Sequence, residues 1–203
     1  MSEILEGRVA IITGAGGGLG AAHARVFAAE GCAVIVNDIN VEAAQAVVDE
    51  ITAAGGKAAV NSSDITNYDD SLNAVKQAID SYGDLHIVVN NAGVNRDRMF
   101  ASMTEQEWDT IMAVHLKGHF CITSHAVHYW RGQSKEGKAV DARIINTTSG
   151  AGLQGSIGQS NYAAAKAGIA ALTLNQAAEL GRYNITANAV APSARTGMTT
   201  AVP

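Results

Sequence analysis

The sequence predicts an α/β domain with a doubly wound parallel sheet in three layers. Short apolar runs alternate with Ala-rich helical stretches along the 203 residues, a pattern typical of βαβ units. The apolar runs are nearly continuous, as in strands that helices cover on both faces. No internal repeat, low-complexity tract or linker interrupts this alternation, and the length suits one domain with a substantial core. We therefore predict a single domain over residues 1–203.

The elements follow one another in strict alternation. Six strands are expected, the third of them weaker than the rest, at 8–13, 32–37, 57–62, 85–89, 142–146 and 185–190. Amphipathic or Ala-rich segments between them predict helices that end near Glu30 or span 41–54, 68–82, 104–130 and 162–180. The helix over 104–130 is expected to be long and uninterrupted.

The composition excludes several classes of protein. Hydrophobic residues make up 47% and charged residues 16%, which is typical of a globular chain, and the net charge of -5 gives no reason to expect nucleic-acid binding. No apolar run reaches the roughly 18 residues that would span a membrane. The start of the chain does not resemble a signal peptide, and Cys32 and Cys121 are expected to be buried thiols. These observations favour a reducing, cytoplasmic compartment.

A glycine-rich turn follows the first strand and opens a helix. In Thr13-Gly-Ala-Gly-Gly-Gly-Leu-Gly20, Gly14, Gly18 and Gly20 permit a tight turn and close approach of a pyrophosphate, with Leu19 beside them. The N–H groups at the start of the helix suit an anion. The alternative is a glycine-rich turn without a ligand, but the strand–turn–helix context argues against it.

Asp38 ends the second strand, where a carboxylate can accept hydrogen bonds from the hydroxyls of an adenosine ribose. A 2′-phosphate there would meet a like charge, and neither Lys nor Arg is placed to compensate. This predicts NAD rather than NADP as the cofactor. The alternative for Asp38 is a helix cap or a turn residue.

Tyr162 and Lys166 are spaced i, i+4 on a predicted helix and so share one face. An ammonium group near a phenol is expected to lower the pKa of that phenol from about 10, so that it can exchange a proton near neutral pH. Such a pair is common by chance. Ser149, at the end of the fifth strand, gives it weight, although a serine there could also be a simple strand-end cap.

Together these residues resemble the classical short-chain dehydrogenases/reductases over essentially the whole chain. The motifs that carry the resemblance stand in the order and spacing of that family: Thr13-Gly14-x-x-x-Gly18-x-Gly20, Asp64, Asn90-Asn91-Ala92-Gly93, Ser149, Tyr162-x-x-x-Lys166 and Pro192. The resemblance implies a Rossmann-type fold with strand order 3-2-1-4-5-6, and homodimers or homotetramers.

The resemblance also implies roles for single residues. Tyr162 would be the general acid/base, Lys166 would lower its pKa and hold the nicotinamide ribose, and Ser149 would orient the substrate oxygen. The remaining cofactor contacts that it implies are Asp64 and Ile65 beside the adenine, Asn90, Ala92 and Gly93 along the cleft, and Pro192 and Thr196 on the nicotinamide side.

The chain departs from the family in three places. His115 stands where the family usually has an Asn that supports a proton-relay water; a histidine can also hold water or relay protons, or it is simply a satisfied helix histidine. Pro192-Ser193 replaces Pro-Gly, and the segment after it is one residue short, which leaves the register of Thr196 open. The sequence stops at Pro203, so the C-terminal part of the usual family fold is expected to be absent from it.

Within the family, three segments resemble the (3R)-hydroxyacyl-CoA dehydrogenase domains of peroxisomal multifunctional enzymes of type 2. They are Val36-Asn37-Asp38, Arg96-Asp97-Arg98 and Val114-His115-Leu116. This implies a 3-hydroxyacyl-CoA as substrate, including one with a steroid-derived acyl group. The alternatives are a 3-oxoacyl-thioester reductase, a hydroxysteroid dehydrogenase and, from another class, a non-catalytic NAD-binding regulatory protein.

Metal binding is not expected. His115 and His119 are spaced i, i+4, but no glutamate joins them in an HExxH arrangement.

Overall fold

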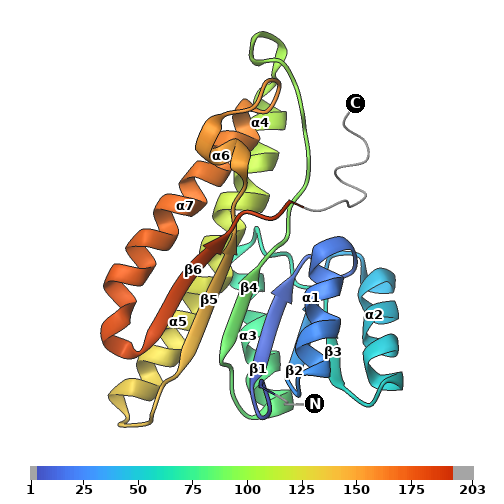
Figure 1. Cartoon of the computed structure of the whole chain (residues 1–203), viewed down its shortest axis with the longest axis vertical. Helices are drawn as coiled ribbons and strands as arrows, with labels where there is room; N and C mark the ends of the chain where they lie inside the picture. The colour runs from blue at the N-terminus through green and yellow to red at the C-terminus, as the bar shows by residue number, and fades with distance from the viewer. Residues whose placement is uncertain (1–3, 194–203) are drawn as a thin grey trace.

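The computed structural model describes residues 4–193, which form a six-stranded parallel sheet with helices on both faces (Figure 1). The strand order is β3-β2-β1-β4-β5-β6, as the family resemblance implies. The strands are β1 (Val9–Thr13), β2 (Ala33–Asn37), β3 (Lys57–Asn61), β4 (Ile87–Asn90), β5 (Ala142–Thr147) and β6 (Ile185–Val190). The order reverses at β1, which pairs with β2 on one side and β4 on the other.

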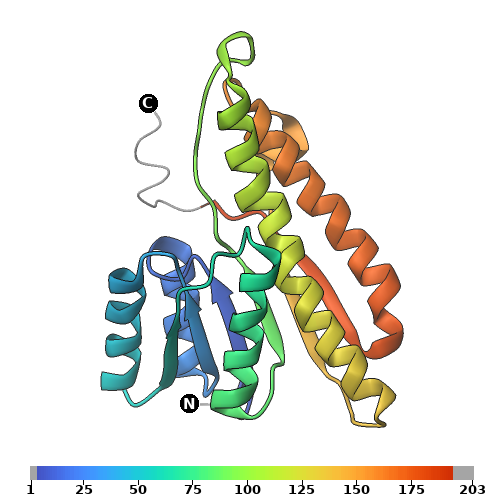
Figure 2. The same cartoon turned by 180° about the vertical axis from the view of Figure 1, so that it is seen from behind.

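Two helical layers enclose the sheet (Figure 2). One face carries α1 (Gly18–Ala29) and α2 (Val41–Ala53), which cover β1 to β3. The other carries α3 (Tyr68–Tyr82), α5 (Gly118–Lys135) and α7 (Ser160–Leu180). The three predicted layers are therefore present. On the α1 side the helices do not extend over β6, where Thr186 and Asn188 are exposed.

The helices begin where the sequence supplies caps. Asn40 and Asn67 accept hydrogen bonds from backbone N–H groups in the first turns of α2 and α3. Gly83, with φ of 84°, ends α3 in the left-handed conformation that glycine adopts most easily. Thr104 and Glu107 form a capping box at the start of α4 (Glu105–Ile111).

The long helix expected over 104–130 is not uniform. It consists of α4, a π-helical segment η2 (Met112–Lys117) and α5, which continues to Lys135. A π-helical turn inserts extra backbone, so it changes the direction of side chains within an otherwise continuous helix, and such turns often occur at functional sites. The remaining short elements are η1 (Phe100–Ser102), α6 (Gly150–Gln154) and η3 (Gly181–Tyr183), none of which the sequence patterns predict.

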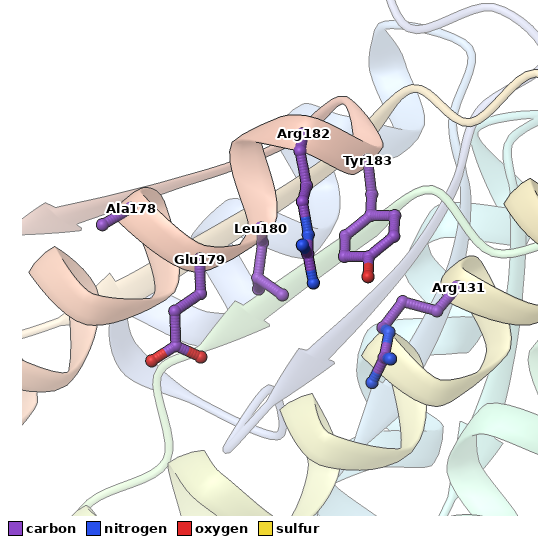
Figure 3. A pocket seen from close by; sticks show the side chains of 6 residues that line it. All are labelled: Arg131, Ala178, Glu179, Leu180, Arg182 and Tyr183. Carbon is purple, nitrogen blue, oxygen red and sulfur yellow. The ribbon is translucent and has the colours of Figure 1, made fainter.

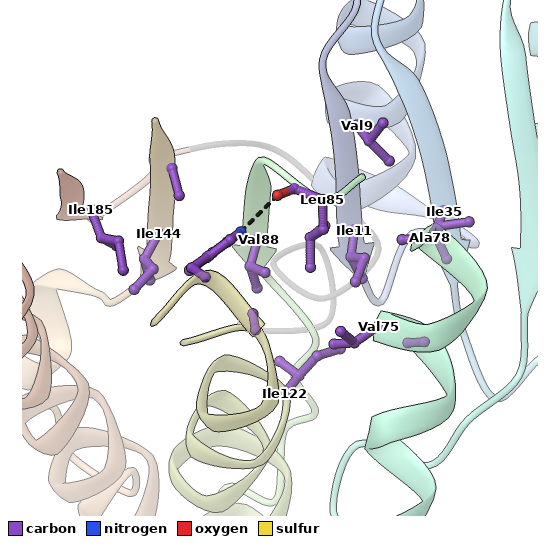
Figure 4. Packing of buried hydrophobic residues seen from close by; sticks show 14 of the residues in the cluster. Val9, Ile11, Ile35, Val75, Ala78, Leu85, Val88, Ile122, Ile144 and Ile185 are labelled. Carbon is purple, nitrogen blue, oxygen red and sulfur yellow. Dashed lines mark hydrogen bonds between the residues drawn. The ribbon is translucent and has the colours of Figure 1, made fainter. Parts of the chain in front are cut away.

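The larger part of the core lies between the sheet and α3 and α5. Figure 4 shows Ile11, Val88 and Ile144 of the sheet facing Val75 of α3 and Ile122 of α5. Trp130 is 2% exposed, and its Nε1 donates a hydrogen bond to the Leu85 carbonyl oxygen at 2.6 Å. That bond joins the end of α5 to the segment before β4 and so fixes α5 at the amino end of the sheet, opposite the site described next.

Candidate active site

Most of the predicted site residues gather at one edge of the sheet. All six strands are parallel, so their carboxyl ends meet there, and ligands of such sheets bind at that edge near the reversal of strand order. The residues at or just after these strand ends are Gly14, Asp38, Asp64, Asn90, Ser149 and Pro192. Pro192 is exposed. Thr196 lies outside the described residues.

The turn between β1 and α1 packs closely against the loop after β4. Gly14 has a φ of +61°, and a Cβ there would lie 2.7 Å from the Cα of Ala92. Gly20 is equally tight, since a Cβ there would lie 2.2 Å from the Gly14 carbonyl oxygen. Gly18 has a φ of +53° and opens α1, with Leu19 half-buried in its first turn. Only glycines allow this turn to lie so near the crevice.

Hydrogen bonds hold the two sides of this crevice in place. Thr13 Oγ1 accepts from the backbone N–H groups of Asn91 and Ala92, each at 3.0 Å. Asn91 Nδ2 donates back to the Thr13 carbonyl oxygen at 3.0 Å. Asn90 Nδ2 donates to Thr123 Oγ1 at 2.8 Å and to Asn146 Oδ1 at 2.9 Å. The crevice between β1 and β4 is therefore built before any ligand enters.

The start of α1 suits the pyrophosphate of a dinucleotide. Its N-cap is Gly17, which provides no side chain to cap the first N–H groups, and its first turn contains no acidic residue. A Cβ on Gly17 would meet no atom within 4 Å, so the backbone there faces open space. Free N–H donors at the positive end of a helix favour an anion.

Asp38 lies beside the glycine-rich turn. Its Oδ2 accepts a hydrogen bond from Gly16 N at 3.0 Å, and its Oδ1 accepts one from Asn40 N at 2.9 Å. The helix-cap alternative is wrong, because Asn40 rather than Asp38 caps α2. The bond to Asn40 is a local turn contact, whereas the bond to Gly16 places the carboxylate beside the glycine-rich turn.

Asp64 and Ile65 differ in where their side chains lie. Asp64 is exposed, and its Oδ1 accepts from Thr66 N and Thr66 Oγ1, both at 2.8 Å. Ile65 is 6% exposed and packs in the core against Gly118, where a Cβ would lie 2.8 Å from Ile65 Cδ1. Of the two, only the Asp64 side chain is open to a ligand.

Ser149 begins a short helix that the sequence patterns missed. It is the N-cap of α6, and its Oγ accepts from Ala151 N at 3.2 Å. The same hydroxyl lies near Tyr162 and acts to lower the pKa of the phenol, which favours the phenolate. The cap interpretation is therefore confirmed, and the cap fixes the hydroxyl just after β5 and near the tyrosine, while the active-site role of Ser149 stays a prediction.

Tyr162 and Lys166 lie one turn apart on α7, as the spacing predicts. Lys166 is 2% exposed, its Nζ donates to the Thr147 carbonyl oxygen at 2.6 Å, and the same atom lies 5.5 Å from the centroid of the Tyr162 ring. Asn161, fully buried, donates from Nδ2 to the backbone oxygens of Arg96 and Glu107 and so anchors the start of α7. The Tyr162–Lys166 pair is thus held from both sides.

The expected fall in the pKa of Tyr162 is wrong for this structure. Burial raises the pKa of Tyr162 above 10 and outweighs the hydrogen bond with Ser149, which lowers it; the charge of Asp97 raises it further. Burial also lowers the pKa of Lys166 from 10.5 to about 8. The spacing in the sequence predicts that Tyr162 and Lys166 lie on one face of the helix. How far each group is desolvated depends on the packing around it, which the spacing does not show.

His115 lies in the π-helical segment and faces the tyrosine. Its ring and that of Tyr162 are in edge contact, with centroids 5.2 Å apart. Its Nε2 lies 2.8 Å from the Val94 carbonyl oxygen and 3.1 Å from Val94 N, so it bonds to that backbone whichever ring nitrogen carries the proton. Burial and the Lys166 charge lower its pKa to about 4, so the imidazole is neutral near pH 7 rather than close to its titration point.

His119 is a neighbour of this site that the sequence reasoning did not use. It is 1% exposed, and neither ring nitrogen has a hydrogen-bond partner among residues 4–193. The Lys166 charge acts on it, and burial holds its pKa well below 6.5. Its spacing of four residues from His115 is the one signal that could have placed it here. A further set of unpartnered buried atoms lies in the same region: His115 Nδ1, Asn90 Oδ1 and Thr147 Oγ1.

The fold and this arrangement define a nucleotide-binding α/β protein with a Ser–Tyr–Lys site. The family model for short chain dehydrogenases matches residues 8–202, and the chain belongs to that family. In a solved structure, a short chain dehydrogenase from Mycobacterium avium is 58% identical, with a TM-score of 0.93 over 96% of this chain and 70% of that one.

Two curated relatives have more specific names. Hydroxyacyl-CoA dehydrogenase ChsB1 of Mycobacterium tuberculosis is 50% identical over 202 residues, which cover 96% of this chain and 63% of the relative. The peroxisomal multifunctional enzyme type 2 of Mus musculus is 42% identical over 210 residues, covering 97% of this chain and 27% of the relative. The resemblance to the type 2 multifunctional enzymes is thereby confirmed, and the chain spans less than two thirds of either relative. Across residues 4–193, no helix is both long and apolar enough to cross a membrane.

Proposed function

We propose that the protein is an NAD-dependent oxidoreductase that interconverts a secondary alcohol and a ketone. The observation that carries this proposal is the convergence of Ser149, Tyr162 and Lys166 beside the crevice between β1 and β4. A protein that only binds a dinucleotide has no need for a proton-transferring phenol with a serine and a lysine around it.

The chain supplies the proton chemistry. When bound, a nicotinamide supplies the acceptor or donor of the hydride. Ser149 Oγ orients the substrate oxygen, and Tyr162 Oη takes the proton of the alcohol during oxidation or returns it to the ketone oxygen during reduction. Lys166 Nζ, held at Thr147 by a 2.6 Å hydrogen bond, stabilises the negative charge that forms on the phenol. His115 closes the other edge of the phenol as a neutral ring.

The preference for NAD is proposed from Asp38. Its carboxylate lies at the glycine-rich turn, with Oδ2 on Gly16 N, and a 2′-phosphate on the ribose would face that negative charge. The contacts of Gly14, Gly18, Leu19, Gly20, Asp64, Ile65, Asn90, Ala92, Gly93 and Pro192 with the cofactor are proposals of the same kind, that of Ile65 through its backbone because its side chain is buried. So is that of Thr196.

The proposed substrate is a 3-hydroxyacyl-CoA, including one with a steroid-derived acyl group. The support is the name of the hydroxyacyl-CoA dehydrogenase of M. tuberculosis at 50% identity. We further propose that the protein is cytoplasmic and acts as a homodimer or homotetramer. A hollow that includes Met112, Leu116 and Phe120 lies on the outer side of η2 and α5, and Phe120 is 49% exposed, which suits contact with a second copy.

The test is formation of NADH from NAD and a series of (3R)-hydroxyacyl-CoA thioesters, followed by absorbance. Tyr162→Phe is expected to abolish turnover while NAD still binds. Tyr82→Phe, a tyrosine on α3 away from the site, is the matched control and is expected to retain full activity.

Each other outcome identifies an alternative. Turnover only as reduction of 3-oxoacyl thioesters would indicate the reductase, and turnover only of free hydroxysteroids would indicate a hydroxysteroid dehydrogenase. Saturable NAD binding without turnover of acyl-CoA thioesters, steroids or simple alcohols would reject catalysis and favour a regulatory NAD-binding protein.

A further inference from the structure

A second hollow lies at the end of the sheet opposite the candidate active site. It has a volume of about 360 Å³ and is lined by Arg131, Ala178, Glu179, Leu180, Arg182 and Tyr183 (Figure 3). Arg131 comes from the last turns of α5, and the other residues come from the end of α7 and from η3. Because η3 leads into the amino end of β6, this hollow is separate from the crevice at the carboxyl ends of the strands.

Two guanidinium groups converge on one aromatic ring in this hollow. The guanidinium carbon of Arg131 lies 5.4 Å from the centroid of the Tyr183 ring, and that of Arg182 lies 4.8 Å from it. Figure 3 shows Arg182 beside Tyr183, with Arg131 approaching below the hydroxyl. The ring attracts each cation, but the two like charges repel each other.

Neither guanidinium has a carboxylate partner in the described part of the chain. No ion pair joins Arg131 or Arg182 to an acidic residue there, although Glu179 lines the same hollow. The Nε of Arg131 is buried and has no hydrogen-bond acceptor among residues 4–193. A buried charged N–H without an acceptor is unfavourable, so a ligand that lies against the Arg131 guanidinium and accepts from it would stabilise this arrangement.

Tyr183 adds a third donor. Burial acts to raise the pKa of Tyr183, but the nearby guanidinium groups of Arg131 and Arg182 outweigh that and lower the pKa overall. A guanidinium group has N–H donors and no acceptor, and the phenol O–H of Tyr183 can donate as well. The hollow therefore presents mainly donors, which suits a ligand that only accepts hydrogen bonds.

We propose that Arg131, Arg182 and Tyr183 form a binding site for a phosphate group, either free phosphate or the phosphate of a monoester. We favour a phosphate over a carboxylate because of the number of acceptor oxygens. A single guanidinium group can bind both oxygens of a carboxylate, whereas a tetrahedral phosphate has further oxygens that a second guanidinium group can bind. Leu180, 8% exposed, provides an apolar wall, and the small Ala178 side chain leaves room for the ester group. The protein has a net charge of -5, so its overall charge does not attract anions, and binding depends on this local pair of cations.

The test uses NMR of the arginine Nε–H groups, because these signals report on the site itself rather than on the glycine-rich turn. Inorganic phosphate is titrated at constant ionic strength, and a separate titration with chloride is the comparison for non-specific anion effects. The Arg131 Nε–H signal is expected to shift saturably with phosphate. Arg182→Gln, a change at an exposed residue, is expected to weaken this binding about tenfold or more, the loss expected for a charge-assisted hydrogen bond.

Arg25→Gln is the matched control, since Arg25 is also a surface arginine but pairs with Glu50 at 2.6 Å. It is expected to leave the phosphate titration unchanged. A parallel titration with ribose 5-phosphate distinguishes the source: tighter binding than inorganic phosphate indicates a monoester, and equal binding indicates free phosphate. An Arg131 signal that does not respond to either compound, or that shifts equally with chloride or in Arg182→Gln, would overturn the proposal.

Discussion

Replacement of Lys166 by methionine tests how the protein buries the charge of its candidate catalytic lysine. The side chain is 2% exposed, and burial lowers its pKa from 10.5 to about 8. The difference is about 2.5 pH units, and at about 1.36 kcal/mol per unit the folded state carries a penalty of about 3 kcal/mol for the ammonium charge.

The sign of this penalty determines its pH dependence. A lysine whose pKa is depressed in the folded state is disfavoured when charged, so the penalty is present in full below about pH 8 and disappears as the pH rises through 10.5. Between about pH 7 and about pH 9.5 the wild-type protein should therefore gain about 2 kcal/mol of stability relative to Lys166→Met, in which no charge titrates. His115 and His119, whose pKa values lie below this pH range, and Tyr162, whose pKa burial raises above 10, titrate outside it and add little to this change.

The assay is urea denaturation of both proteins, followed by circular dichroism at several pH values. The absolute difference at one pH also contains the lost hydrogen bond to Thr147, so the informative quantity is its change with pH. A difference in unfolding free energy that stays constant from about pH 7 to about pH 9.5 would refute the reasoning, because it would mean that Lys166 titrates as it does in water.

Three further predictions concern other parts of the structure. Gly14→Ala is expected to lower the free energy of unfolding by about 1–3 kcal/mol and to abolish NAD binding, because φ at Gly14 is +61° and a Cβ would lie 2.7 Å from the backbone of Ala92. Gly132→Ala is the control: a Cβ there would meet no atom within 4 Å, so thermal melts should show no change or a gain in stability. Asp38→Ala is expected to weaken NAD binding and to raise the affinity for NADP relative to that for NAD. Calorimetry that finds the ratio of the two affinities unchanged would contradict this role of Asp38. Trp130→Phe is expected to destabilise the fold by about 2–4 kcal/mol in urea denaturation, because it leaves the Leu85 carbonyl oxygen without its donor and opens a cavity; a change below about 0.5 kcal/mol would contradict it.

The order of elements and the edge of the sheet where the site lies were predictable from local patterns. Continuous apolar runs identify buried strands, and caps such as Asn67 and Gly83 mark helix ends, because both depend on residues close in sequence. The π-helical segment at 112–117 was not predictable, since it differs from an α-helix only in its hydrogen bonding and leaves the apolar pattern nearly unchanged.

By itself, the sequence determined the family, the strand–helix alternation and the positions of Ser149, Tyr162 and Lys166, because these depend on residue type and on short spacings. Only the tertiary structure decided the electrostatics. It raises the pKa of Tyr162, lowers those of Lys166 and His115, and brings His119 beside them. It also places the Arg131 guanidinium of α5 against the ring of Tyr183, which lies 52 residues later in the sequence, at the opposite end of the sheet. Desolvation and long-range contact depend on what packs around a side chain, and that is set by elements far apart in the chain.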